Sequence, residues 1–397
     1  MARRLIVTLM VVGYFGVWLS AEILWAHRAE QEERVIIPKP GTDKKPIRRE
    51  RETWVPPPAP KEEPKEKRIP YSTGKEKYAC EVLIRFTSGL SIPRGPHKRE
   101  AGPYELGISK WGETEGMITG PSSIKVDRFE NIYVLDLVNR RILKYSSRGK
   151  FLKMIKLSER HGAGDFDIDT EGNIYTLGFP HGFKKEQRKH LCELAGISTH
   201  DVSIFFVEKY DSVGKSAGIS YFPFLHKWAV ENSFWPQKIL VDDKGYLHIS
   251  EKVFKFTALE LLELYKTYEG IFSPTSGEFY SIKKDIQEIQ ILKGKEKLES
   301  IGSINLTRQL EGVEFIKEDA NENIYLCCKF EKTKEIWKIN RDGEVVVSIC
   351  NLPYSDACKF VATVSENDDI YLLIYWLGSV YKENHTVELI KWYKEEG

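Results

Sequence analysis

The feature that most constrains the fold of this 397-residue chain is a short motif that recurs through its C-terminal two thirds. In each complete copy an Asp is followed, after three residues, by Asn, Ile and Tyr. The complete copies are Asp127 to Tyr133, Asp169 to Tyr175 and Asp319 to Tyr325. Weaker copies begin at Asp242 and Ser365, and a degenerate copy spans Ser273 to Tyr280. A unit that recurs about every 40 to 46 residues is typical of a propeller blade.

Each copy predicts two β-strands joined by a tight turn, because Asp and Asn favour turns and the flanking residues alternate in polarity. In the first copy, Arg141 to Tyr145 and Lys150 to Leu157 add a third and a fourth strand. Four short antiparallel strands per repeat predict an all-β fold, and the aromatic content of 12% agrees with packed sheets. We therefore expect a β-propeller over residues 76–397.

The first copy resembles an NHL repeat on three groups of residues. These are Pro121, Ile124, Val126 and Asp127, then Asn131 to Val134, then Asn139 to Ile142. The resemblance extends from about residue 120 to the C-terminus and is strongest in the three complete copies. It implies a six-bladed propeller, while the degenerate copies leave five or seven blades open. The recurrent Asp and Asn are expected to cap turns and lock blades rather than to form a site.

Ring closure is expected to use the start of the domain, because an open propeller exposes two sheet edges. The segment Cys80 to Phe86 alternates in polarity and is predicted to complete the blade formed around Asp369 to Tyr393. Two segments interrupt the repeat pattern. Lys184 to Ala195 predicts a short helix, whereas Phe256 to Tyr268 fits a helix and a pair of strands equally well.

The N-terminal part of the chain has a different composition. After a short basic tail, residues 1–4, the segment 5–26 is an apolar run with a single charge at Glu22. A helix of that length, with a rise of ~1.5 Å per residue, matches a bilayer core of ~30 Å and predicts a transmembrane signal anchor. A cleavable signal peptide is the alternative, although Leu19 and Leu24 suit position −3 of a cleavage site poorly.

Residues 27–75 contain nine of the chain's 18 prolines among alternating Lys, Arg and Glu, which predicts a disordered linker. Arg3 and Arg4 precede the apolar run without any acidic residue and favour a cytoplasmic N-terminus. We therefore expect a single-pass protein of the cell membrane whose propeller is extracytoplasmic, either periplasmic or extracellular. The protein would be secreted if the apolar run is cleaved.

Charge and cysteine patterns remove several classes of function. With 59 basic and 58 acidic residues the formal net charge is +1, so no nucleic-acid partner is expected. The six cysteines form no Cys-x-x-Cys pair, and no catalytic motif is present, so no catalytic residue, metal or cofactor is predicted. Cys350 and Cys358 flank one inter-repeat loop, where a disulfide and two separate thiols are both open.

Two functions remain. The first is a membrane-tethered scaffold that binds a protein or glycan on a propeller face. The second is a metal-dependent enzyme of the lactonase or lyase kind at the central channel, as in propellers that resemble NHL proteins. The missing catalytic motif favours the scaffold. Candidate binding residues lie in the insertion after the second repeat motif: His181, Lys184, His190 and His200. With His161 these histidines are also the best metal candidates, but an insertion this polar is more simply a solvated surface.

Overall fold

The computed structural model describes residues 71–90, 102–110, 118–158, 161–180, 184–198, 202–225, 238–249, 252–257, 261–267, 270–285, 288–295, 297–331, 333–353, 358–376 and 385–395. All of these lie in one unit, Glu66–Gly397. The predicted signal anchor at 5–26 and most of the linker at 27–75 fall outside them. Among the residues described, no helix has the length and apolar character that a membrane span requires.

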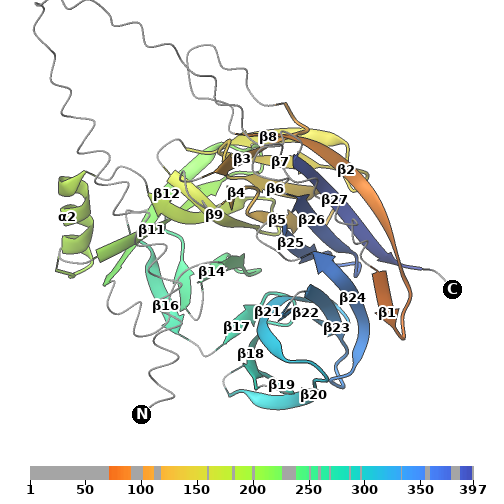
Figure 1. Cartoon of the computed structure of the whole chain (residues 1–397). Coiled ribbons are helices and arrows are strands. Elements are labelled where there is room, and N and C mark those ends of the chain that lie inside the picture. Colours follow the sequence, from red (N-terminus) through yellow and green to blue (C-terminus); the bar gives the residue numbers. More distant parts are fainter. Residues whose placement is uncertain are drawn as a thin grey trace, which may run out of the picture. The chain divides into compact units, whose positions relative to one another are not determined.

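The described residues form six sheets, which we number as blades in chain order (Figure 1). Blade 1 contains β5 to β8: Ser123–Val126, Ile132–Asp136, Arg141–Tyr145 and Phe151–Lys156. Blade 2 contains β9 to β12: His161–Ile168, Ile174–Pro180, Val202–Tyr210 and Ser216–Leu225. Blade 3 contains β13 to β16: Ile239–Val241, Tyr246–Ile249, Lys252–Lys255 and Glu263–Thr267.

The remaining blades follow the same plan with additions from the start of the chain. Blade 4 contains β17 to β20: Ile271–Ser273, Glu278–Lys284, Glu288–Gly294 and Glu299–Asn305. Blade 5 contains β21 to β24, which are Leu310–Glu318, Ile324–Phe330, Thr333–Ile339 and Val345–Pro353, and also β1, Tyr71–Gly74. Blade 6 contains β25 to β27, which are Cys358–Val364, Ile370–Trp376 and His385–Lys394, and also β2 to β4, which are Tyr78–Leu90, Glu105–Lys110 and Ile118–Thr119.

The blades are arranged in a ring in which five neighbouring pairs meet through their first strands, while blades 3 and 4 meet through His248 and Phe272. The first strands of neighbouring blades contact one another, as in the pairs β5 with β9, β9 with β13, β21 with β25, and β25 with β5. The first strand of each blade is therefore the innermost. This arrangement confirms the predicted all-β, six-bladed propeller, including a blade at the degenerate copy, where β17 and β18 flank the turn after Ser273.

Ring closure uses the start of the domain, as predicted. Strand β2 pairs antiparallel with β27, in a register that places Phe86 opposite Val387. The predicted start of the propeller at residue 76 is too late, however. Strand β1 pairs antiparallel with β24 and places Tyr71 opposite Cys350, so residues 71–74 belong to blade 5 and not to a linker. A four-residue strand beside a proline-rich segment has too little pattern to be recognised.

The insertion in blade 2 forms the predicted helix, α2, at Lys185–Leu194. Its start is capped by Gln187, whose Oε1 accepts the Lys184 backbone N–H at 3.2 Å. Leu191 and Cys192 are buried and pack against β11. In the second interruption, residues 263–267 form the edge strand β16, which pairs with β15. All five of its residues are exposed, so the strand lacks the alternation that distinguishes a strand from a helix.

The possible disulfide at Cys350 is not formed. Cys350 is a free thiol on β24, and its sulfur lies 3.2 Å from the Ser348 hydroxyl oxygen. Cys327 and Cys328 are also free and are buried in β22, where burial raises the pKa of both thiols. These buried thiols pack as small apolar groups, which is the other alternative that the sequence left open.

The hydrophobic core lies between blades. Clusters of buried apolar side chains join blades 1 and 2, 2 and 3, 4 and 5, 5 and 6, and 6 and 1. Among the described residues no such cluster joins blades 3 and 4. That interface instead contains a ring stack between His248 of β14 and Phe272 of β17, with centroids 3.5 Å apart and planes at 6°. Within the described residues this joint is thus formed by aromatic ring contacts rather than by an apolar cluster.

A matched pair of substitutions on β2 tests the closing strand. Ile84 is 5% exposed in the cluster between blades 6 and 1, whereas Val82 on the same strand is 42% exposed. We expect Ile84→Ala to lower the free energy of unfolding by about 2 to 4 kcal/mol through lost burial and a cavity. Val82→Ala should change it by less than about 0.5 kcal/mol. Equal losses in chemical denaturation would contradict the closure described here.

Candidate functional site

Each complete motif forms the same polar arrangement at the turn between the first two strands of its blade. In blade 1, Asp127 Oδ1 accepts the backbone N–H groups of Phe129 and Asn131, both at 2.9 Å. Asp127 Oδ2 accepts the Tyr133 hydroxyl at 3.0 Å. Asp169 and Asp319 hold their own Asn and Tyr partners in the same way. One carboxylate thus satisfies the turn and the start of the second strand.

A lysine on the third strand completes the arrangement. In five blades it lies opposite the tyrosine in the strand register: Tyr133 with Lys144, Tyr175 with Lys209, Tyr280 with Lys293, Tyr325 with Lys338, and Tyr371 with Lys391. In blade 1 the Lys144 ammonium also lies 3.3 Å from Asp127 Oδ2. In blades 1, 2 and 5 the repeated unit is therefore an Asp–Tyr–Lys triad, and in blades 4 and 6 the Tyr–Lys pair is kept without the motif Asp.

Two blades have Ser instead of the motif Asp, and in both the next blade supplies a carboxylate. In blade 4 the Tyr280 hydroxyl donates to Glu318 Oε1 of blade 5 at 2.5 Å. In blade 6 the Tyr371 hydroxyl donates to Glu130 Oε2 of blade 1 at 2.9 Å. A buried tyrosine hydroxyl without an acceptor is costly, so these carboxylates keep the triad chemistry intact across the blade boundary.

Blade 3 departs from this plan in a different way. Its Asp242 is retained and accepts the Lys244 and Tyr246 backbone N–H groups. The tyrosine position is His248, and the position opposite it on the third strand is Val253. His248 Nε2 lies 3.1 Å from Asp242 Oδ2. Two long side chains are thus replaced by two shorter ones at the joint between blades 3 and 4.

A cavity of about 330 Å³ occupies the space beside these shorter side chains. Its lining comes from both blades: Asp242, Lys244, Tyr246, His248, Val253, Tyr265, Lys266, Phe272, Gly277, Phe279 and Lys295. Aromatic rings form much of its wall, and Tyr246 and Tyr265 stack with centroids 4.7 Å apart. The exposed wall is nonetheless more polar than apolar, because three lysines, an aspartate and a histidine lie beside these rings.

In the Asp242–His248 hydrogen bond the carboxylate is the acceptor. Burial would raise the pKa of Asp242, but the hydrogen bonds from His248 and from two backbone N–H groups lower it below its ordinary value. The ionised carboxylate only accepts, so in the neutral ring Nε2 carries the proton and Nδ1 has a lone pair. His248 is 6% exposed, and within the described residues its buried Nδ1 has no hydrogen-bond partner.

The inner strands, where a channel enzyme would place its ligands, show a different pattern. Asp165 on β9 accepts the Ser123 hydroxyl of β5 and the Ile239 backbone N–H of β13. Asp167 accepts the Val241 backbone N–H and lies 3.6 Å from the Lys125 ammonium. These carboxylates join three blades. In the part of the chain that the structure describes, no three His, Cys, Asp or Glu side chains form a group that could hold a metal ion.

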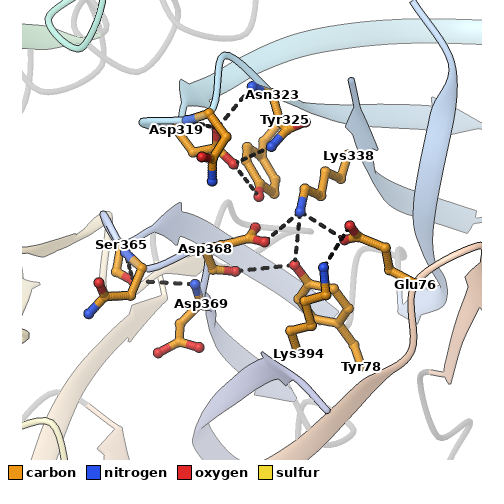
Figure 2. Close-up of polar contacts among 12 residues, drawn as sticks. Glu76, Tyr78, Asp319, Asn323, Tyr325, Lys338, Ser365, Asp368, Asp369 and Lys394 are labelled. Carbon is orange, nitrogen blue, oxygen red and sulfur yellow. Dashed lines mark hydrogen bonds and ion pairs between the residues drawn. The ribbon is translucent and has the colours of Figure 1, made fainter. Parts of the chain in front are cut away.

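A second polar cluster joins the start of the domain to blades 5 and 6 (Figure 2). The Lys338 ammonium is 3% exposed and lies 2.8 Å from Glu76 Oε2 and 2.5 Å from Asp368 Oδ2. Lys394 contacts the other Glu76 oxygen at 2.8 Å. Tyr78 donates to the Asp368 backbone carbonyl at 3.4 Å. This cluster fixes the chain between β1 and β2 and is a structural anchor, because its charges are paired with one another.

Of the four binding residues predicted from the sequence, the structure describes Lys184 and His190, and neither lines the cavity. Lys184 and His190 are both exposed, one at the start of α2 and the other on the helix itself. His181 and His200 lie outside the described residues, and so does the side chain of His161. The cavity is lined by blades 3 and 4, whereas α2 packs on blade 2. The four candidates stay a prediction that the structure does not join into a site.

The cavity residues were not among the binding residues predicted from the sequence, although the repeat pattern singles out one of them, His248. If the repeats are aligned at their Asp, His248 occupies the column that holds Tyr in the three complete copies. A lone exception at a repeated structural position indicates a local role. The partner position, Val253, and the neighbouring Phe272 become visible only when strand register and blade contacts are known.

Comparisons with known proteins do not assign this chain to a family. No protein-family model matches the sequence, and no curated protein matches it. Among solved structures, virginiamycin B lyase from Staphylococcus aureus is 10% identical with a TM-score of 0.36, over 71% of this chain and 97% of that chain. A luciferin-regenerating enzyme is 9% identical with a TM-score of 0.38, over 68% and 90%.

A protein from Lactobacillus plantarum is 11% identical with a TM-score of 0.37, over 82% of this chain and 100% of that chain. All three TM-scores are below 0.5, so no activity is carried over from these proteins. The six-bladed architecture rests on the strand order and the contacts between blades.

The Asp368 carboxyl gives a pH prediction for the anchor cluster. Burial, above all, and the carboxylates of Asp319 and Glu76 raise its pKa from 3.8 to about 7, although the Lys338 ammonium 2.5 Å away, Tyr78 and Lys394 act in the opposite direction. Because the folded pKa is the higher one, the stabilisation is full below pH 3.8 and is lost as the pH rises through about 7. The slope reaches at most about 1.4 kcal/mol per pH unit.

Asp368→Asn removes this titration and keeps a residue that tolerates the observed φ of 70°. The free energy of unfolding of the variant, minus that of the wild type, should therefore rise between pH 4 and pH 7.5. Urea denaturation across this range measures the difference. A difference that is flat or falls with pH would show that Asp368 does not titrate in this window. Asp342→Asn, on an exposed turn, is the matched control.

Proposed function

We propose that this protein is a ligand-binding propeller, and that its ligand occupies the cavity between blades 3 and 4. The observation that carries the proposal is the replacement of the Tyr–Lys pair of the other five blades by His248 and Val253. The replacement accompanies a partly open pocket of about 330 Å³ at the joint where, among the described residues, no apolar cluster forms.

The proposed setting of this site follows from the sequence. We propose that residues 5–26 anchor the chain in the cell membrane and that the propeller is extracytoplasmic. The support is the apolar run itself, followed by the proline-rich segment. In that setting a small molecule or a terminal glycan residue is the ligand that suits a cavity of this size. A binding face for a protein has no comparable support among the described surfaces.

A second candidate function is catalysis in the same cavity. The His248–Asp242 hydrogen bond is the arrangement that orients an imidazole as a general base. No Ser, Thr, Cys or second carboxylate lies among the cavity's lining residues, which favours binding over turnover. The two functions differ in outcome, because an enzyme converts its ligand and a binding protein returns it unchanged.

The double substitution His248→Tyr with Val253→Lys tests the proposal by restoring the triad of the other blades. We expect it to keep or raise the melting temperature, because the cavity is filled and Asp242 regains a tyrosine hydroxyl donor. A library of small metabolites and glycans should yield ligands for the full-length wild type that this variant no longer binds.

Lys184→Ala, on the exposed insertion, should leave binding unchanged. If every ligand found binds the filled variant as tightly as the wild type, the cavity is not the site. Mass spectrometry of the recovered ligand separates the two candidate functions, since conversion that is lost in His248→Gln would establish the enzyme.

A further inference from the structure

The axis of the ring carries a layer of side chains separate from the cavity between blades 3 and 4. On the first strand of every blade, one residue pairs directly with the motif tyrosine, or with His248 in blade 3. In chain order these six residues are Lys125, Asp167, Leu240, Ile271, Lys317 and Thr363. We call this set the axial layer. Because the first strand of each blade is the innermost, the layer surrounds the axis at one level.

The charged members of the axial layer interact across the axis. Lys317 belongs to blade 5, and its ammonium group interacts electrostatically with Asp167 of blade 2 and Lys125 of blade 1. In a ring of six blades, blades 5 and 2 lie on opposite sides of the axis. All three side chains are only partly exposed. The axis is therefore narrow at this level, and its charged groups are partly withdrawn from water.

Lys317 lacks a counter-charge of its own. Within the described residues it forms no ion pair and no hydrogen bond. Burial lowers its pKa and Lys125 acts in the same direction, although Glu366 and Asp167 oppose them. Asp167 is already used, because it accepts the Val241 backbone N–H at 2.8 Å and lies 3.6 Å from the Lys125 ammonium. A partly buried ammonium without a partner is costly, so an anionic ligand would stabilise it.

The carboxylates at the nearby turns do not take this role. Glu130 accepts the Asn367 side-chain amide at 3.1 Å and the Tyr371 hydroxyl at 2.9 Å. Glu366 is exposed on its turn, where water solvates the carboxylate. Neither forms an ion pair with Lys317 in the part of the chain that the structure describes.

A hydroxyl group lies between the two lysines in the order of the blades. Lys317, Thr363 and Lys125 occupy the same position in blades 5, 6 and 1. Thr363 is 8% exposed, and its hydroxyl has no hydrogen-bond partner among the residues described. Three successive blades thus direct two ammonium groups and one free hydroxyl donor to one level of the axis. Donors of this kind are what a carboxylate or phosphate group needs.

The other side of the axial layer is apolar. Blades 3 and 4 contribute Leu240, which is partly exposed, and Ile271, which is 40% exposed. On the innermost strands, apolar surface in contact with water is surface that a ligand can bury. The layer is therefore basic and polar on one side and apolar on the other.

We propose that the ring axis binds a small organic anion, whose carboxylate or phosphate group lies between Lys317 and Lys125 and whose apolar substituent packs on Leu240 and Ile271. This site is separate from the cavity between blades 3 and 4 and does not depend on it. Lysine is a point charge and does not distinguish a carboxylate from a phosphate. The two anionic groups are therefore separate arms of the test.

The experiment measures the affinity of the full-length protein by calorimetry for hexanoate, hexyl phosphate, hexanamide and acetate. At least one of the two hexyl anions should bind about tenfold or more tightly than hexanamide, which has no charge, and acetate, which has no apolar substituent. Its affinity should fall as the salt concentration is raised, because part of the attraction is electrostatic.

Variants of Lys317 assign the anionic group to the axis. Lys317→Met keeps the apolar stem without the charge, so it should weaken binding of the hexyl anion about tenfold and leave hexanamide unchanged. Its melting temperature should be kept or raised, because an unpaired ammonium is removed. Lys317→Arg keeps the charge and should retain most of the affinity. Lys215→Met, at an exposed lysine of blade 2, is the matched control.

Four results would overturn the axial site: no probe binds, hexanamide or acetate binds as tightly as the hexyl anions, or Lys317→Met binds them as tightly as the wild type. The fourth concerns the variant His248→Tyr with Val253→Lys, which fills the cavity between blades 3 and 4 and should leave binding of the hexyl anion unchanged. If that variant abolishes it, the anion occupies the cavity and the axial site fails. A library ligand that depends on the cavity would support the proposed function whichever result the axis gives.

Discussion

The carboxylate at the first turn, which four of the six blades have, is the interaction on which the rest of the structure depends. A propeller is built from short strands, and each blade must reverse direction within a few residues without leaving backbone N–H groups unpaired. Asp127, Asp169, Asp242 and Asp319 solve this in the same way, by accepting two backbone donors with one oxygen. The other oxygen remains for the side chain six residues later. The turn and the second strand are thus positioned by one group.

This dependence explains why the exceptions are informative. In blades 4 and 6, where the Asp is absent, Glu318 and Glu130 reach the same tyrosine hydroxyl from the next blade. In both blades the tyrosine hydroxyl keeps a carboxylate acceptor, although this carboxylate comes from the next blade. Blade 3 retains its Asp but changes what the carboxylate holds, from a phenol to an imidazole. The fold tolerates this change because the turn itself still has its acceptor, and a joint between two blades gains an unfilled space.

The repeat made the architecture predictable, because a motif that fixes a turn also fixes the strands on either side of it. The six blades, the helix at residues 184–195 and the closing strand at residues 80–86 followed from such patterns. The cavity did not, because its walls come from three strands and a neighbouring blade. His248 stands out once the copies are aligned, but nothing in the sequence indicates that Phe272 lies against it. The histidines and lysines of the insertion were predicted to bind a ligand because of their chemical type. Lys184 at the start of α2 and His190 on the helix are both exposed to solvent.

The short strand β1 has a mechanical consequence. Any pull on the chain before Tyr71 reaches β1 and its pairing with β24 first, then Glu76 with its links to Lys338 and Lys394, and only then β2. Because β2 closes the ring by pairing with β27, its loss would open the propeller. Tension is therefore borne by two successive connections that can break and re-form while the ring stays shut. Force applied before Tyr71 would therefore load these two connections before it reached the closing strand β2.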